Sequence, residues 1–498
     1  MKRSVPILKK ICALGVLGAA ITVPSMASAQ GSTGPVDRHN MRSVGYNDLQ
    51  ARSAYQPWIE NQGGRFIAYV GHHGGEALNP LTGQIEPNGT SIVDVTNPAN
   101  PKYLHHLPGP AGAGEAGGAQ MVRICSGDVL PKGESGKYYL LRATGAGSHE
   151  IYDVTDPESP TLVTVVVDGL NDTHKSWWDC ETGIGYLVSG VPGWNVNRHL
   201  QIFDLSDPAN PVFIRNFGLP GDQPGATPDP DNPNPGLHGP IVVGNRAYLG
   251  YGTNRNGILQ ILDVEKLLTG PAEPTEENLL FPQIARIELG ALQGAHTTLP
   301  MLNIRPPEFE DFTEGTERDM VAIINESIGN ECREPAQQQM YMWDVTTETE
   351  PHGVSNYHVD PRRGLEELGG NYCDIGGRFG AHSSHENMNN PYGNKVVFLA
   401  YFNAGIRAVD VRNPWSPREL GYYVPRVNPR TDERCVTTDG VETCKIAIQT
   451  NNLEVDDRGF IYAVDRANSG MHIVDLTDEA KKELTRRPEA GTPPYTEN

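Results

Sequence analysis

One short motif recurs along most of this chain and constrains the fold more than any other feature of the sequence. It reads apolar, any residue, apolar, aspartate, apolar, and several copies are followed by a Ser/Thr–Asx–Pro–x–x–Pro corner. The seven copies lie at residues 91–95, 150–154, 201–205, 260–264, 341–345, 407–411 and 472–476. Self-similarity of this kind predicts one domain built from copies of a single supersecondary unit.

Each copy of the motif predicts a strand followed by a tight corner. Four copies carry the proline-punctuated turn, as at residues 96–101 and 206–211, where the Asx side chain caps its own turn and proline stops the strand ladder. A second β-rich run precedes each copy, as at 460–464, and a third follows the corner, as at 212–214. With one further entering strand, each unit is a four-stranded antiparallel meander, which predicts an all-β propeller.

These copies resemble the LVIVD-repeat family of secreted β-propeller proteins, and the resemblance covers nearly the whole mature chain. Seven copies imply a single seven-bladed propeller over residues 30–498, with long loops on one face and a short C-terminal tail. The last blade lacks an outer strand, because residues 477–487 look helical or frayed. We expect residues 42–46, which resemble the outer-strand segment 419–423, to close the ring. Two packed β-sandwiches are the alternative, since counting strands does not exclude them.

The N-terminal segment, residues 1–29, indicates export. Four basic residues precede an apolar run at 11–23, and Ala27-Ser28-Ala29 forms a small-x-small cleavage site. This is the pattern of a secretory signal peptide, and its apolar stretch is too short for a comfortable membrane span. We therefore expect a periplasmic or secreted protein without a membrane span after signal removal, with an uncleaved N-terminal anchor as the alternative.

Six cysteines follow the predicted signal peptide, and in an oxidising compartment an even set indicates up to three disulfides. Only one pairing is indicated by the sequence. Cys435 and Cys444 flank a hairpin-like turn at residues 437–440, so we expect them to pair with each other. The other four cysteines leave their connectivity open.

Charge and missing motifs exclude several classes of function. The chain has 40 Lys and Arg against 61 Asp and Glu, a net charge of -21, which argues against a nucleic-acid partner or an anionic membrane surface. We find no P-loop, no GxSxG, no HExxH and no CxxCH. Nucleotide hydrolysis, serine esterase chemistry, zincin proteolysis and covalent haem therefore lack their usual residues.

Histidines stand in register with the repeat. A His-x-x-apolar pattern opens the entering strand of four units, at His174, His238, His296 and His385. The spacing from His238 to Asp263 equals the spacing from His385 to Asp410, whereas the other two histidines require insertions. The entering strand of a propeller is innermost, so equivalent histidines converge near the axis. Because neutral imidazole is a general ligand for transition metals, the pattern predicts a metal site.

Two points about this ligand set stay open. His382 lies just before His385 in the same segment and is an alternative ligand. A family turn that simply prefers histidine is the alternative explanation of the whole pattern. The remaining units offer Thr450 and, less clearly, Gln56 and Gln120 at the same rim, which leaves one side without histidine, as a catalytic metal requires.

Further candidates lie on the connections between second and third strands, which reach the same face. We expect Tyr251 or Glu326 to handle protons as a catalytic residue, and His72, His73 and Arg466 to support the metal or contact substrate. Long loops crowd this face, as at residues 218–237, 360–384 and 425–448, and long loops commonly carry function.

The sequence thus predicts a metal-dependent enzyme, with oxidoreductase chemistry favoured by analogy with other propellers that hold a metal on their axis. Iron or copper is favoured, and zinc is the alternative. A small-molecule or polymer substrate would bind at the long-loop face. The competing hypothesis is a non-catalytic binding or scaffold propeller that recognises a glycan, polymer or protein through that face.

Overall fold

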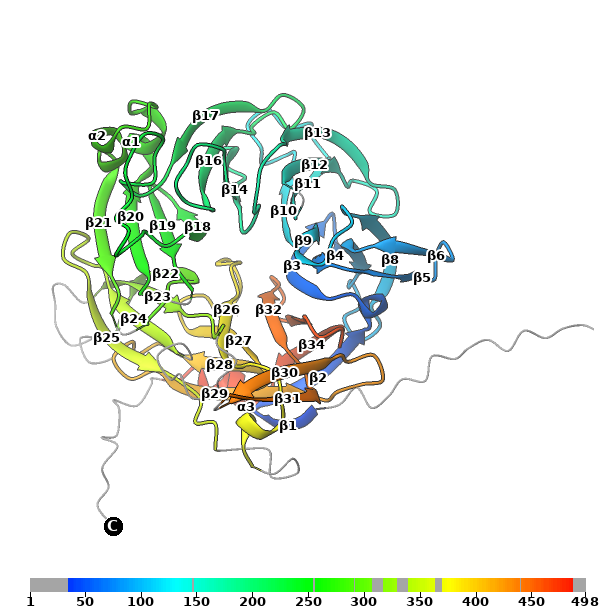
Figure 1. The fold of residues 1–498 in the computed structure, drawn as a ribbon. Helices are drawn as coiled ribbons and strands as arrows, with labels where there is room; N and C mark the ends of the chain where they lie inside the picture. The colour runs from blue at the N-terminus through cyan, green and yellow to red at the C-terminus, as the bar shows by residue number, and fades with distance from the viewer. Residues whose placement is uncertain are drawn as a thin grey trace, which may run out of the picture.

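The computed structural model describes residues 35–486, except 146, 254–255, 291, 307–316, 329–338, 363–369 and 439. The predicted signal peptide, residues 1–29, lies outside these residues. The chain forms antiparallel, mostly four-stranded sheets arranged around a ring, so the fold is all-β and propeller-like (Figure 1). Two packed sandwiches, the alternative architecture, do not describe this arrangement.

Four sheets are meanders of consecutive strands. Their strands are β10 (Met121–Ser126), β11 (Tyr138–Thr144), β12 (Ser148–Asp153) and β13 (Thr161–Val167); β14 (Trp177–Asp179), β15 (Ile184–Ser189), β16 (His199–Asp204) and β17 (Val212–Phe217); β18 (Leu237–Val243), β19 (Arg246–Tyr251), β20 (Ile258–Asp263) and β21 (Gln283–Glu288); and β22 (Thr297–Ile304), β23 (Arg318–Ile324), β24 (Met340–Asp344) and β25 (His352–Tyr357).

The other strands complete the ring. One sheet contains β3 (Ala54–Gln62), β4 (Arg65–Gly74), β7 (Gly89–Asp94) and β8 (Lys102–Pro108), with β9 (Gly114–Ala119) added against β4. A nine-stranded sheet contains β26 (Phe379–Ser384), β27 (Val396–Phe402), β28 (Ile406–Asp410), β29 (Arg418–Pro425), β1 (Pro35–His39), β32 (Thr450–Val455), β33 (Ile461–Asp465), β34 (Met471–Leu476) and β2 (Met41–Asn47).

Short elements decorate this ring. Two hairpins are β5 (Glu76–Asn79) with β6 (Gln84–Pro87), and β30 (Glu433–Thr438) with β31 (Val441–Ile446). The described helical segments are η1 (Leu49–Ala51), α1 (Val264–Thr269), α2 (Glu276–Leu280), η5 (Tyr372–Asp374) and α3 (Asp478–Glu483). Within the described ranges, none of the helices has the length and hydropathy of a membrane span.

In five of the seven copies the repeated aspartate closes its strand with a local turn. Asp94 accepts a hydrogen bond from the backbone N–H of Thr96 at 2.9 Å, and Asp344 accepts one from Thr346 at the same distance. Asp153, Asp204 and Asp410 accept equivalent bonds from the backbone two positions further along. Such Asx turns satisfy a backbone donor as the strand ends, which explains why aspartate recurs at that position in these five units, whereas Asp263 caps α1 and Asp475 pairs with Arg42.

The hydrophobic core lies between neighbouring sheets. Ile151 of β12 packs in one cluster with Leu187 of β15, and Tyr69 of β4 packs in another with Ile124 of β10. Since both faces of a sheet are covered by its neighbours, the strands are apolar on both sides. The axis is therefore left for the ends of the innermost strands, which Figure 1 shows as β3, β10, β14, β18, β22, β26 and β32.

The predicted ring closure is present. Strand β2 pairs antiparallel with β34, so the segment 42–46 supplies the outer strand beside the last motif. Arg42 reinforces the pairing through an ion pair with Asp475 at 2.7 Å. The last copy is followed by α3, which agrees with the helical character expected after residue 477.

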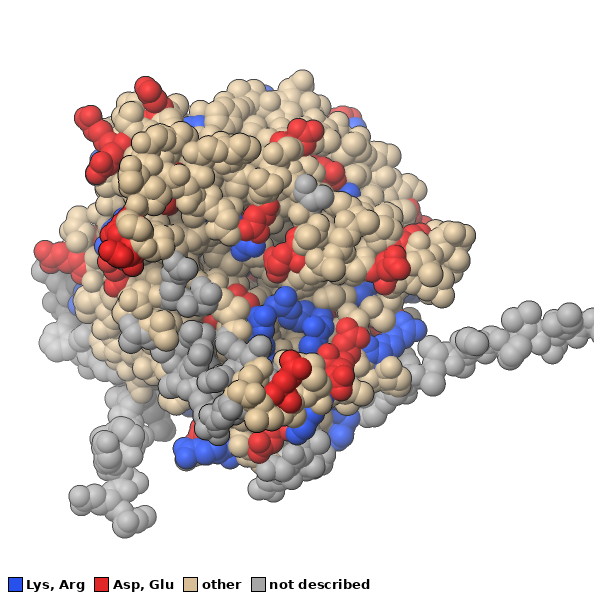
Figure 2. Space-filling view, in the orientation of Figure 1, with Lys and Arg blue, Asp and Glu red and all other residues tan. Residues whose placement is uncertain are grey.

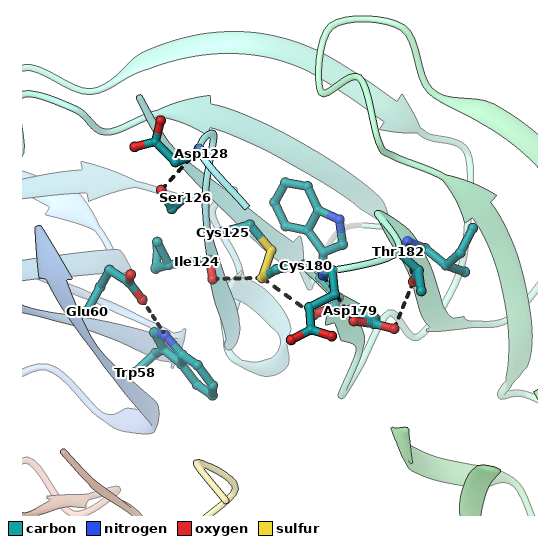
Figure 3. The surroundings of a disulfide bond; sticks show 12 residues. Trp58, Glu60, Ile124, Cys125, Ser126, Asp128, Asp179, Cys180 and Thr182 are labelled. Carbon is teal, nitrogen blue, oxygen red and sulfur yellow. Dashed lines mark hydrogen bonds between the residues drawn. A yellow bond between two sulfur atoms is a disulfide. The ribbon is translucent and has the colours of Figure 1, made fainter. Parts of the chain in front are cut away.

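Disulfides fix two further places. Cys435 and Cys444 are bonded across β30 and β31, as the hairpin predicts. Cys125 is bonded to Cys180, which ties β10 to the turn after β14 and so joins two neighbouring sheets (Figure 3). This second pairing was left open by the sequence. Cys373 is also disulfide-bonded, and Cys332 lies outside the described residues.

Candidate metal centre

Three of the four predicted ligands meet near the axis, together with His382. His238 and His382 lie within β18 and β26, while His174 and His296 stand just before β14 and β22. All four are therefore delivered by the innermost strands of four different sheet regions (Figure 1). We call these four residues the histidine centre.

The rings of the histidine centre form a continuous arc. The Nε2 atoms of His174 and His238 lie 3.0 Å apart. The ring centroids of His238 and His296 are 3.4 Å apart, and those of His296 and His382 are 4.4 Å apart. The Tyr55 hydroxyl from β3 closes one side, at 3.2 Å and 3.3 Å from the Nε2 atoms of His174 and His238.

All four histidines are buried and neutral. Burial is the main cause that lowers the pKa of His174, His238 and His296 well below the usual value, and it lowers the pKa of His382 to about 4. His238 Nδ1 and His296 Nε2 have no hydrogen-bond partner among the described residues. Neutral imidazoles with free nitrogens are the form in which histidine binds a metal.

Two of the rings are oriented by neighbours on their Nδ1 side. The Nδ1–H of His382 donates to the carbonyl of Asn451 at 2.5 Å, which leaves its Nε2 lone pair free. His296 Nδ1 forms a hydrogen bond of 3.0 Å with Thr297 Oγ1. Bonds of this kind fix the tautomer and angle of metal-binding histidines.

A carboxylate joins one end of the arc. Single ligand atoms from His296, Glu326 and His382 all lie within 4.8 Å of one another. Burial acts to raise the pKa of Glu326, but its electrostatic surroundings, including the positive charges of Arg378 and Arg466, lower it overall, and Arg378 forms an ion pair with it at 3.0 Å. Two imidazoles and a carboxylate are a ligand set suited to iron and other transition metals.

The mouth of the centre carries mixed charges. Glu115, whose side chain is 47% exposed, lies 3.6 Å from His73 Nε2 and 3.5 Å from His174 Nδ1. Arg466 donates to His73 Nε2 at 3.2 Å. Figure 2 shows this face of the molecule hollowed near its centre, with Lys and Arg side chains gathered on the side toward β32.

Next to the histidine centre is a second buried cluster, which we call the ion-pair centre. Glu386 forms ion pairs with Arg123 and Lys175, and Gln56 donates to its carboxylate at 3.0 Å. The Arg123 guanidinium lies 5.0 Å and 4.9 Å from the ring centroids of Trp58 and Trp177. Lys175 connects the two centres, because its Nζ also donates to Thr297 Oγ1 at 3.5 Å.

His385 is not part of the histidine centre, contrary to the prediction. Its Nδ1 accepts a hydrogen bond from the backbone N–H of Phe398 at 3.3 Å, and its ring lies against Phe398. Residues an odd number of positions apart in extended backbone point to opposite sides, so His382 and His385 cannot both face the axis. The alternative ligand considered from the sequence, His382, takes the place.

Two other side chains predicted for the site, those of Tyr251 and His72, lie away from the histidine centre. The Tyr251 hydroxyl donates to Gln260 at 2.9 Å within the hydrophobic core, because its strand end faces the neighbouring sheet and not the axis. His72 bonds to Ser91 Oγ at 2.7 Å inside its own sheet, since successive strand residues alternate and only His73 faces the mouth.

Of the remaining predictions, Glu326, His73 and Arg466 lie around the centre, as described above. Thr450 occupies its expected strand start and pairs through its backbone with Phe402, but the next residue, Asn451, is the one that bonds to His382. Sequence reasoning missed Tyr55 and Glu115. Tyr55 is adjacent to Gln56, which the register of the repeat places at the rim, so moving that register by one residue would have identified Tyr55.

The chain was also compared with known proteins. No family model matches it, and no curated protein matches it. Among solved structures it is similar to Raptor from Chaetomium thermophilum, with a TM-score of 0.45, 10% identity, and coverage of 90% of this chain and 28% of that chain. It is also similar to Sqt1 from Chaetomium thermophilum, with a TM-score of 0.46, 9% identity, and coverage of 87% and 99%. Likenesses this distant carry no argument about activity.

Proposed function

We propose that this protein is a seven-bladed propeller of the LVIVD-repeat type that holds a transition-metal ion in its histidine centre and acts as a metal-dependent enzyme outside the cytoplasm. The blade count follows if the nine-stranded sheet is read as two blades joined by the single β27–β32 bridge. Disulfides such as Cys125–Cys180 are compatible with export.

The observation that carries this proposal is the convergence of His174, His238, His296 and His382 from four separate parts of the chain. Buried histidines elsewhere, such as His472, also leave their ring nitrogens unbonded, so the support for a ligand comes from the meeting of four rings at one place. Iron is favoured over copper and zinc where Glu326 joins two histidines, since that donor set is common in non-haem iron sites.

A bound iron or copper would supply redox and Lewis-acid chemistry, which favours an oxidoreductase. The residues of the chain set the conditions for it. Burial raises the pKa of Tyr55 well above its usual value, so its hydroxyl stays protonated and can donate toward the centre. Glu326 stays ionised, so its carboxylate can accept a proton. In this scheme Tyr55 takes the role that the sequence suggested for Tyr251.

The test is metal analysis of the mature protein after reconstitution with iron, copper or zinc. We expect stoichiometric metal in the wild type and a large loss in His238→Ala and His382→Ala. His385→Ala is the matched control, because it removes a buried histidine from the same segment and should keep the metal. A wild type that binds none of the three ions would overturn the proposal and favour the binding or scaffold propeller instead.

A further inference from the structure

The mouth of the histidine centre holds more arginine than the composition of the chain suggests. Four arginines stand around it in a protein whose net charge is -21. They are Arg198, Arg378, Arg434 and Arg466. Figure 2 shows cationic side chains gathered beside the central hollow. A local excess of positive charge in an acidic protein attracts anions to that place.

Three of these arginines are neutralised by carboxylates. Arg198 pairs with Asp172 at 2.7 Å, Arg378 pairs with Glu326 at 3.0 Å, and Arg434 lies 3.7 Å from Asp432. Arg466 differs from them. Among the described residues no carboxylate lies within ion-pair distance of its guanidinium, which donates to the neutral ring of His73 at 3.2 Å.

Arg466 is held firmly in place by its backbone. Its N–H donates to the carbonyl of Gln449 at 3.0 Å, and its own carbonyl accepts from Ser53 Oγ at 2.8 Å. The preceding residue, Asp465, accepts from the N–H groups of Gln449 and Ala467. A rigid turn of this kind presents the guanidinium without a large loss of entropy on binding.

Its position points toward the reaction site. Arg466 contacts His73, the His73 ring lies 5.1 Å from the ring of Tyr55, and Tyr55 contacts His174 and His238. The positive charge of Arg466 also bears on Glu326 and His382. Arg466 is thus linked to the histidine centre through only two side chains, His73 and Tyr55.

We propose that Arg466 is the binding site for the carboxylate of a small anionic substrate, whose other end would lie at the histidine centre. A planar guanidinium matches a carboxylate through two parallel hydrogen bonds. One free cation matches a singly charged carboxylate better than a doubly charged phosphate. The proposal rests on the proposed function for the role of the bound molecule, but the anion subsite itself does not need the metal.

The experiment measures binding of benzoate, acetate and inorganic phosphate by calorimetry, on the mature protein with and without metal. We expect saturable binding of a carboxylate in both forms, weaker binding of phosphate, and a loss of about 10–100-fold in carboxylate affinity in Arg466→Gln. Arg305→Gln, which removes the same charge from a distant exposed ion pair, should bind as the wild type does.

Metal content measured on the same samples separates the two proposals. If Arg466→Gln keeps its metal and loses carboxylate binding, both stand. Carboxylate binding that appears only with metal and ignores Arg466→Gln would overturn the subsite while leaving the metal centre intact. Tighter binding of phosphate than of either carboxylate would overturn the assigned substrate class, and an absence of saturable binding by all three probes would overturn the subsite.

Discussion

The histidine centre and the ion-pair centre are both buried and both assembled from the innermost strands or the residues beside them, yet one pairs opposite charges and the other gathers neutral rings. In the ion-pair centre, Glu386 faces two cations, Arg123 and Lys175, and is also bonded by Gln56. In the histidine centre, neutral rings crowd together and nitrogens such as His296 Nε2 stay unbonded. Similar burial therefore serves two different ends.

The two centres differ in what burial costs them. A charge removed from water is costly, so buried charges persist where they are paired, and the ion-pair centre has the pairing of a structural element. A neutral imidazole costs less to bury, but leaving its nitrogen unbonded still sacrifices a hydrogen bond. Three of the four rings, those of His174, His238 and His296, leave such a nitrogen, which supports the proposed metal site, whereas the paired charges of the ion-pair centre link the inner strands.

The largest effect is expected from Glu386→Gln, which breaks the ion-pair centre and spares the histidines. Both cations would then be buried without their carboxylate, and breaking such a pair costs about 3–5 kcal/mol in unfolding free energy. Burial acts to raise the pKa of Glu386, yet Lys175 and Arg123 lower it to about 2, as expected for a carboxylate held by two cations. Urea unfolding measures the loss.

Two further variants make this test specific. Glu317→Gln removes a carboxylate from an exposed pair with Arg305, and we expect a change of at most about 1 kcal/mol. Adding Lys175→Met to Glu386→Gln should recover part of the lost stability, because one unpaired cation is gone. If Glu386→Gln unfolds at the same urea concentration as the wild type, the ion-pair centre does not stabilise the fold as argued above.

The sequence predicted the ring because its signal repeats. The motif aspartates and the entering strands are local features, and each copy confirms the others, so the sheets and the ring closure by β2 were accessible. His174, His238 and His296 followed from the same register. The pairing of Cys125 with Cys180 was not accessible, because it depends on how neighbouring sheets pack and six cysteines allow fifteen pairings.

The wrong site predictions chose the right segments of the chain but assigned side chains to the wrong side of the strand. Applying the spacing between His238 and Asp263 to Asp410 selected His385, although His382, three residues earlier and within β26, is the histidine that joins the centre. Tyr251 ends the strand expected from the sequence, but its hydroxyl is bonded to Gln260 of the same sheet within the hydrophobic core. Which side of a strand a residue faces depends on the packing around it, and neither spacing nor residue type reveals that.

Lowering the pH should distinguish the two kinds of buried group, because it protonates neutral imidazoles and leaves paired charges unchanged. His472, packed against Tyr46 and outside the histidine centre, has its pKa lowered by burial to about 4. Its unfolded value is about 6.5, so the unfolded chain binds the extra proton between these values. Its contribution to stability is complete above about pH 6.5 and is lost as the pH falls toward 4.

We therefore expect wild type to lose about 2–3 kcal/mol more than His472→Phe between about pH 7.5 and 4.5, measured by urea unfolding at each pH. Phenylalanine keeps the aromatic packing and removes the titration. Glu386 should add little to this loss, because its carboxyl, with a pKa of about 2 in the folded protein and about 4.3 in the unfolded chain, stays mostly ionised in both states over this range. Parallel stability curves for the two proteins would contradict this interpretation of His472.

The smallest effect tests whether the two centres are coupled. Thr297 stands between them, with its Oγ1 bonded to His296 Nδ1 at 3.0 Å and to Lys175 Nζ at 3.5 Å. Thr297→Val keeps the shape and removes the hydroxyl, so His296 loses the group that fixes its tautomer. We expect metal affinity to fall by about 10-fold, measured by competition with a chelator, since loss of such an orienting bond typically costs that much.

The neighbouring threonine provides the matched control. Thr298 Oγ1 donates to the carbonyl of Tyr248 at 3.1 Å, away from the axis, so Thr298→Val should cost a similar amount of stability, about 1 kcal/mol, without changing metal affinity. A Thr297→Val protein that binds metal as tightly as the wild type would mean that His296 is oriented by its contacts with His238 and His382 alone. The ion-pair centre would then stabilise the fold without any influence on metal binding at the histidine centre.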